Sequence, residues 1–204
     1  MHPVQKKLTI VLWALAILAA GVFFASRMRQ RPADVDMPVL EPIGTVPEFA
    51  LTNQDGQTVT LDTLRGQPWI ADFIFTRCGG PCPIMTSKMA GLQEKLPGSI
   101  KLVSFSVDPE FDTPEVLKSY AKKFNADESR WHFLTGTKDA IFALARGMLL
   151  VAIPANEANP IIHDERFLLV DGLGQIRGAY HSNDPQEMKQ LELDAQELAK
   201  ESGT

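Results

Sequence analysis

The chain has 204 residues, of which 45% are hydrophobic and 22% are charged, and its formal net charge is −5. This composition is typical of a globular protein, and it excludes the concentrated basic surface of most nucleic-acid-binding domains. The only two cysteines, Cys78 and Cys82, exclude a small scaffold held together by several disulfides. Two cysteines this close together indicate redox chemistry or metal binding, with a pair of buried core thiols as the alternative.

The first predicted element is a membrane anchor at residues 8–25, a run without any charged residue. Its length reaches the lower limit for crossing a bilayer, which is about 17 residues. A cleaved signal peptide is the alternative, although residues 18–21 match the small-residue cleavage pattern poorly. We expect residues 1–7 to form a cytoplasmic tail, residues 26–42 to form a proline-containing linker, and residues 43–204 to form a domain on the periplasmic side of a bacterial inner membrane.

Strands and helices alternate through the rest of the chain, which predicts an α/β layered domain. Asp72 is unexpected inside the apolar strand 69–75 and requires a partner. Residues 62–66 are predicted to form a short turn, and residues 152–162 a loop. The predicted strands are 49–51, 58–61, 69–75, 101–107, 131–136, 166–170 and 175–180, and the predicted helices are one beginning near Cys82 and those at 113–124, 138–148 and 184–200.

Cys78 and Cys82 lie where the strand 69–75 leads into a helix. The free N–H groups and the dipole at a helix start favour negative charge, so we expect a lowered thiol pKa there. Residues four apart on a helix have Cα atoms about 6 Å apart, which is within the range that a disulfide spans. The pair therefore has the spacing either to form a disulfide or to share one metal ion.

Thiolates are soft ligands that select Cu(I) or zinc, and a structural zinc site needs four protein ligands. Four histidines are available to complete such a site. His2 precedes the anchor and is excluded, His132 is interpreted as structural within a strand, and His181 as part of a surface loop. His163 stands where a loop meets a strand, and the residues alone leave its role as a ligand open.

Four segments together resemble the Sco (SenC) family, and they occur in that family's order. They are Phe75–Pro83 around the cysteines, Asn53–Gly56 before them, Ser106–Pro114 after them, and His163 leading into 167–171. The resemblance extends over about residues 43–200. It implies a thioredoxin-like, peroxiredoxin-like fold, with a central mixed sheet flanked by helices and an N-terminal transmembrane helix.

The resemblance also implies a copper site for Cu(I) and Cu(II), made of Cys78, Cys82 and His163, with the two cysteines as redox-active thiols. The family assembles the CuA centre of cytochrome c oxidase, so the implied partner is oxidase subunit II or another copper-accepting protein. The protein would deliver copper, reduce the partner's cysteines, or do both. Alternatives are a membrane-anchored thiol–disulfide oxidoreductase without metal delivery, a copper or redox sensor, and a peroxide-reducing enzyme.

This chain departs from the family pattern between the cysteines, where Gly79, Gly80 and Pro81 stand and the usual acidic residue is missing. Asp108 and Asp164 are candidate substitutes for that acid. Met85 and Met89, at helical spacing after Cys82, are predicted to belong to the hydrophobic core rather than to the metal site.

Overall fold

The computed structural model describes residues 40–150, 152–153 and 161–202, together with residues 13, 17, 18, 20 and 21. Residues 1–39 and 40–204 form separate units. The predicted tail, anchor and linker lie largely outside the described residues. Within the described part of the chain, no helix is both long enough and apolar enough to cross a membrane.

Residues 40–204 are built around one mixed sheet of eight strands in the order β1-β10-β9-β4-β5-β6-β2-β3. The central strands β4, β5 and β6 run parallel, and the strands on both sides of them pair antiparallel. The strands are β1 (Gly44–Thr45), β2 (Ala50–Asn53), β3 (Thr58–Thr60), β4 (Trp69–Ile74), β5 (Lys101–Ser106), β6 (Trp131–Thr135), β9 (Arg166–Val170) and β10 (Gln175–His181).

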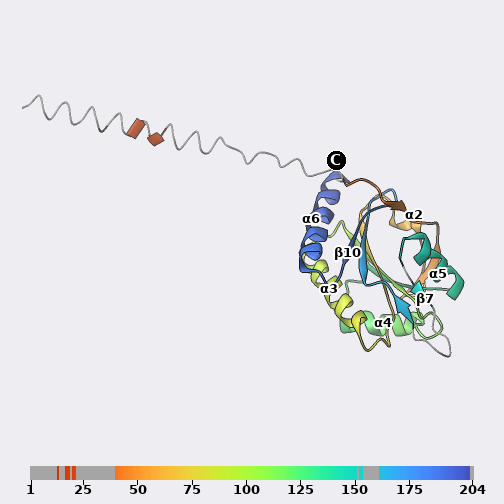
Figure 1. Cartoon of the computed structure of the whole chain (residues 1–204). Coiled ribbons are helices and arrows are strands. Elements are labelled where there is room, and N and C mark those ends of the chain that lie inside the picture. Colours follow the sequence, from red (N-terminus) through yellow and green to blue (C-terminus); the bar gives the residue numbers. More distant parts are fainter. Residues whose placement is uncertain are drawn as a thin grey trace, which may run out of the picture. The chain divides into compact units, whose positions relative to one another are not determined.

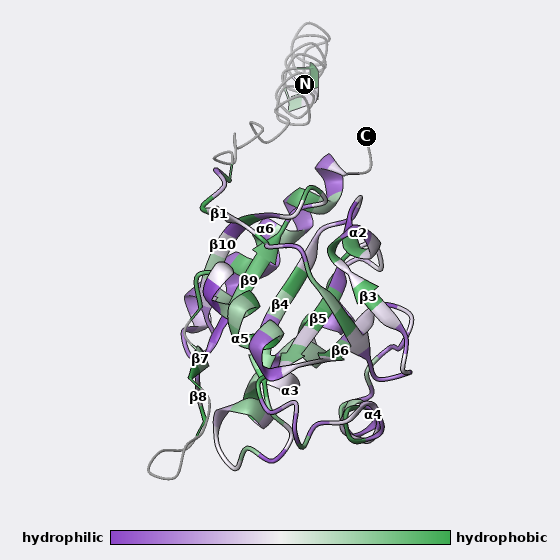
Figure 2. Cartoon of the chain, turned by 90° about the vertical axis from the view of Figure 1, so that its right-hand side faces the viewer, coloured by the Kyte–Doolittle hydropathy of each residue, from purple (hydrophilic) through white to green (hydrophobic). Residues whose placement is uncertain are grey.

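Helices cover both faces of this sheet (Figure 1). On one face α3 (Pro81–Lys95), α4 (Pro114–Lys123) and α6 (Pro185–Glu201) pack over one hydrophobic cluster. On the other face α2 (Leu61–Leu64) and α5 (Lys138–Gly147) pack over a second cluster. Every residue of β4 is buried between the two clusters, which explains why this strand is apolar except at Asp72. Figure 2 shows β4 coloured mostly as hydrophobic.

Three of the predicted helices begin at capping residues that the sequence displays. Thr113, Thr137 and Asp184 each accept a hydrogen bond from a backbone N–H of the first helical turn. These caps satisfy donors that have no partner inside the helix. The helices predicted at 113–124, 138–148 and 184–200 are therefore confirmed to within one or two residues.

The predicted loop at 152–162 is wrong at its described ends. Ala152–Ile153 (β7) pairs antiparallel with Ile162–His163 (β8), forming a separate two-stranded sheet. The predicted turn after β3 is also wrong in part, because its first residues form the short helix α2. A capping box between Thr60 and Thr63 stabilises that helix start.

Asp72, for which the sequence predicts a partner, lies opposite Ser104 on the neighbouring strand β5. Its side chain is fully buried, and neither carboxylate oxygen has full hydrogen-bond geometry to any of the described residues. Burial raises the pKa of Asp72 to about 7, although the neighbouring Ser104 on β5 weakly favours the ionised form. Asp72 is consequently a carboxyl group whose charged form destabilises the fold.

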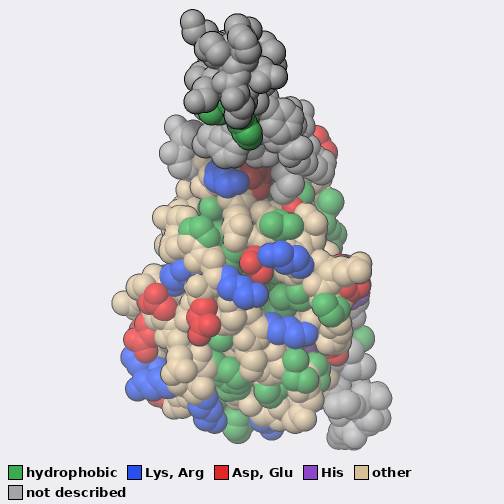
Figure 3. Space-filling model, turned by 90° about the vertical axis from the view of Figure 1, so that its left-hand side faces the viewer, with side chains coloured by type: hydrophobic (Ala, Val, Ile, Leu, Met, Phe, Trp, Pro, Cys, Tyr) green, Lys and Arg blue, Asp and Glu red, His purple; other side chains and the backbone are tan. Residues whose placement is uncertain are grey.

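The surface formed by α3 and α6 carries basic, acidic and apolar side chains side by side (Figure 3). A groove of about 470 Å³ lies between these helices, and lysines line it. Glu192 on α6 bonds Lys95 of α3 at 3.3 Å and Lys189 of its own helix at 3.2 Å. The charges on this surface are thus partly balanced across the two helices.

Candidate metal centre

The two cysteines occupy the junction between β4 and α3. Cys78 is half-buried in the turn that follows β4, and Cys82 is fully buried in the first turn of α3. Pro81 begins the helix, where its missing N–H costs nothing. Neither thiol forms a disulfide in this structure.

His163 reaches the cysteines from β8, which is 81 positions from Cys82 in the sequence. Its Nε2 lies 3.0 Å from the Sγ of Cys82. The two sulfurs and a ring nitrogen all lie within 4.8 Å of one another. Among the described residues, these three make up the one group of cysteine, histidine and acidic side chains that is arranged to hold a metal ion.

The imidazole of His163 is oriented by the backbone beside it. Its Nδ1 lies 3.0 Å from the carbonyl oxygen of Asp164, and the ring of Phe75 meets it edge-on at 5.7 Å between centroids. A carbonyl can only accept, so Nδ1 is assigned as the donor and the Nε2 lone pair faces Cys82. Burial lowers the pKa of His163, which keeps this ring neutral and able to bind a metal.

The expected lowering of a thiol pKa is wrong for Cys82. Burial raises the pKa of this thiol, and the neighbouring Cys78 adds to the effect. Removal of the side chain from water therefore outweighs the favourable field at the start of α3. Metal binding at Cys82 must displace a proton that the metal-free protein retains.

Two residues that were not predicted from the sequence form a chain of hydrogen bonds to the backbone of Cys82. The hydroxyl of Thr86 donates to the carbonyl oxygen of Cys82 at 2.9 Å. The same hydroxyl lies 2.9 Å from the phenolic oxygen of Tyr120 on α4. The position of Thr86, four residues after Cys82, could have indicated this contact, because threonine hydroxyls in helices often bond the carbonyl four residues earlier.

The remaining candidates lie apart from this group. Met85 and Met89 are fully buried in the cluster beneath α3, so their prediction as core residues is confirmed. His132 lies half-buried on β6, as expected. His181 is exposed, and it is the last residue of β10 rather than part of a loop.

Asp108 and Asp164, the proposed substitutes for the missing acid, are both engaged by arginines. Asp108 accepts two hydrogen bonds from the guanidinium of Arg77, at 2.5 and 3.2 Å. Asp164 accepts from Arg166 at 2.8 and 2.6 Å. The structure thus brings neither carboxylate into the group formed by the two thiols and the imidazole.

The SCO1/SenC family model matches residues 40–196. The chain belongs to the SCO1/SenC family. This SCO1/SenC member is 40% identical over 142 residues to a SCO1 protein homolog of Bacillus subtilis (strain 168), a match that covers 67% of this chain and 73% of that relative.

Solved structures agree with this assignment. One is a structure of BsSco, a member of the Sco family of cytochrome c oxidase assembly proteins in which a disulfide switch was identified. It is 33% identical, with a TM-score of 0.71, and the match covers 80% of this chain and 99% of that one. Another is Arabidopsis thaliana ScoI with copper bound, which is 25% identical, with a TM-score of 0.65 and coverage of 78% and 99%. The resemblance and the thioredoxin-like fold predicted from the sequence are confirmed.

Proposed function

We propose that this SCO1/SenC protein binds copper through Cys78, Cys82 and His163 and serves in the assembly of cytochrome c oxidase. The observation that carries the proposal is the convergence of two thiols and a neutral imidazole within 4.8 Å. Thiolates suit Cu(I), and the imidazole adds a ligand that also accommodates Cu(II). Relatives described as copper-bound and as oxidase assembly proteins support it.

Three protein ligands leave the coordination incomplete, so a ligand from an acceptor protein has room to enter. We propose that copper passes in this way to the CuA site of oxidase subunit II or to another copper-accepting protein. The half-buried Cys78 lies nearer to solvent than Cys82, which suits the exchange of a ligand there.

Anaerobic titration of the reduced full-length chain with Cu(I), in competition with a chromophoric chelator, tests the copper proposal. We expect one tightly bound ion per chain, and we expect His163→Ala to weaken binding while the exposed His181→Ala leaves it unchanged. An absence of tight binding, or equal binding by the His163→Ala and wild-type chains, contradicts the three-ligand site.

A second candidate is a thiol–disulfide oxidoreductase, which the two free and neighbouring thiols favour. This activity needs Cys78 and Cys82 but not His163. Reduction of an oxidised CuA-site peptide by wild-type and His163→Ala chains separates the two functions. Equal reduction by both chains supports the reductase, whereas reduction by neither supports copper delivery alone.

We further propose that residues 8–25 anchor the protein in the bacterial inner membrane. Residues 1–7 then lie in the cytoplasm, residues 26–42 form the linker, and the copper-binding domain 43–204 faces the periplasm beside its membrane-bound partner. The uncharged sequence of 8–25 supports this arrangement. Fractionation of cells tests it: the full chain should sediment with membranes and resist extraction by alkaline carbonate, and recovery in the soluble fraction would contradict it.

A further inference from the structure

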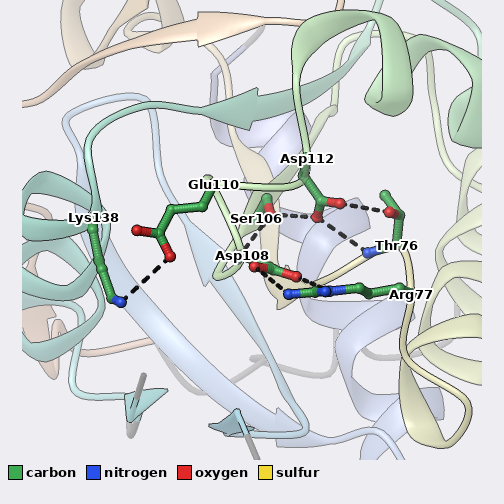
Figure 4. Close-up of polar contacts among 7 residues, drawn as sticks. All are labelled: Thr76, Arg77, Ser106, Asp108, Glu110, Asp112 and Lys138. Atoms are coloured by element: carbon green, nitrogen blue, oxygen red, sulfur yellow. Dashed lines mark hydrogen bonds and ion pairs between the residues drawn. The ribbon is translucent and has the colours of Figure 1, made fainter. Parts of the chain in front are cut away.

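The turn that carries Cys78 is fixed by hydrogen bonds on its N-terminal side, whereas exposed glycines follow on its C-terminal side. The two residues before it, Thr76 and Arg77, are bonded to carboxylates of the loop between β5 and α4 (Figure 4). The two residues after it, Gly79 and Gly80, are exposed. Among the described residues, a Cβ added at Gly79 would meet no atom within 4 Å, and one added at Gly80 would meet just the Sγ of Cys78, at 3.9 Å.

Asp112 makes the most extensive of these contacts. Its carboxylate accepts hydrogen bonds from the backbone N–H of Thr76 at 3.1 Å and from the Thr76 hydroxyl at 2.5 Å. It accepts a third from the hydroxyl of Ser106, at the end of β5, at 2.5 Å. Figure 4 shows the carboxylate between these two segments. Asp112 thereby joins the turn before Cys78 to the rigid end of a central strand.

This link is buried. The side chain of Asp112 is fully buried and burial raises its pKa, whereas the hydrogen bonds from Ser106 and Thr76 favour the ionised form, in which such bonds are shorter and stronger. The loop itself is braced, because the backbone N–H groups of Phe111 and Asp112 both donate to the carbonyl oxygen of Asp108. The guanidinium of Arg77 lies over the ring of Phe111, 4.8 Å from its centroid, and takes no part in the contacts of the Asp112 carboxylate.

The glycines on the other side give Cys78 little support. Glycine has the greatest conformational freedom of any residue, and neither glycine has a side chain that could pack against the described residues around it. The backbone N–H of Gly80 reaches the Sγ of Cys78 at 3.4 Å, which is a local contact within the same turn. Apart from the packing of Cys78 against the hydrophobic cluster beneath α3, the position of this sulfur relative to Cys82 and His163 therefore depends on the residues that precede it.

We propose that Asp112 is a positioning residue for the thiolate of Cys78, acting through Thr76. The inference rests on the proposed copper site and adds a residue to it that touches no ligand atom. In this chain, the hydrogen bonds from Thr76 to Asp112 supply order that the Gly79-Gly80 bridge does not.

Thr76→Val tests the proposal, because valine keeps the shape and the backbone N–H of threonine and removes the hydroxyl bond. We expect Cu(I) affinity to fall about tenfold, in line with the loss of one hydrogen bond to a charged group. Thr76→Ser retains a hydroxyl and should bind like the wild-type chain. Thr58→Val, at an exposed position on β3, is the control for the valine substitution.

The electron paramagnetic resonance spectrum of bound Cu(II) separates positioning from general stability, because it reports the ligand geometry of the folded and loaded fraction alone. We expect Thr76→Val and Asp112→Asn to change this spectrum, and Thr76→Ser to preserve it. Wild-type affinity and spectrum in both Thr76→Val and Asp112→Asn would overturn the proposal.

A second measurement keeps the proposal testable if the wild-type chain binds no copper and the proposed function fails. The equilibrium constant for closing the Cys78–Cys82 disulfide with oxidised glutathione depends on how well the two sulfurs are held together. We expect Thr76→Val to lower this constant about tenfold relative to Thr76→Ser. Equal constants in these two variants would then reject the positioning role.

Discussion

The Nε2 of His163 lies 3.0 Å from the Sγ of Cys82, although one residue stands on β8 and the other in the first turn of α3. The contact joins β8, which pairs with β7, to α3, which packs on the central sheet. A metal ion bound to both side chains would link two segments that are 81 residues apart. The unfolded chain has no such preformed site, so metal binding and folding are coupled.

Copper should therefore stabilise the wild-type chain more than the His163→Ala chain. A ligand that binds only the folded state adds about 2.7 kcal/mol when its free concentration is 100 times its Kd. Thermal unfolding of the reduced protein, with and without one equivalent of Cu(I), measures the shift in Tm. The exposed His181→Ala is the matched control, and a shift in His163→Ala as large as in that control would contradict the prediction.

The two thiols should differ in reactivity in the metal-free protein. Cys82 is fully buried and burial raises its pKa, whereas Cys78 is half-buried. The thiolate is the reactive form, so iodoacetamide should modify the Cys82→Ser chain at least about tenfold faster than the Cys78→Ser chain at pH 7.5. Mass spectrometry of quenched samples measures both rates, and denatured samples should show equal ones. Faster modification of Cys82 in the folded chain would contradict the assignment.

The sequence predicts those parts of the site that depend on local pattern. The apolar run of β4 and the proline that opens α3 place both cysteines at a strand–helix junction. His163 could not be placed from its own surroundings, because β7 and β8 have two residues each and show no periodicity. Only the resemblance to a family brought this histidine to the cysteines.

Local sequence also does not reveal how completely a side chain is removed from water. The start of a helix predicts a lowered thiol pKa, but the depth of Cys82 under its neighbours reverses the direction. Asp72 likewise has a sequence position that demands a partner, and within the described part of the chain Ser104 offsets the effect of burial on its pKa only in part. Both outcomes depend on how completely three layers exclude water, which is a property of the whole domain.

Asp72 should make the stability of the domain fall as the pH rises. Its pKa is about 7 when folded, above the ordinary value of 3.8, so the folded state binds the proton more tightly than the unfolded chain does. The contribution of the neutral carboxyl is fully present below about pH 4 and is lost as the pH rises through 7. The gain in the free energy of unfolding from Asp72→Asn should therefore be several kcal/mol larger at pH 8 than at pH 4.5.

Urea unfolding at both pH values measures this difference, with Asp139→Asn at an exposed position on α5 as the control. The control should show a change below about 0.5 kcal/mol at either pH. A pH-independent effect of Asp72→Asn would mean that the carboxyl does not change its ionisation on folding.

The hydroxyls of Thr86 and Tyr120 should be energetically coupled. They lie 2.9 Å apart in the buried layer between α3 and α4, and Thr86 also bonds the carbonyl oxygen of Cys82. Thr86→Val leaves the phenol of Tyr120 without this partner, which costs about 1–3 kcal/mol, and Tyr120→Phe costs a similar amount. The double variant removes both polar groups, so it should cost about 1 kcal/mol less than the sum of the single variants. Urea unfolding of the four chains at one pH gives the coupling directly. Strict additivity would show that the two hydroxyls do not depend on each other, and that the support beneath Cys82 comes from Thr86 alone.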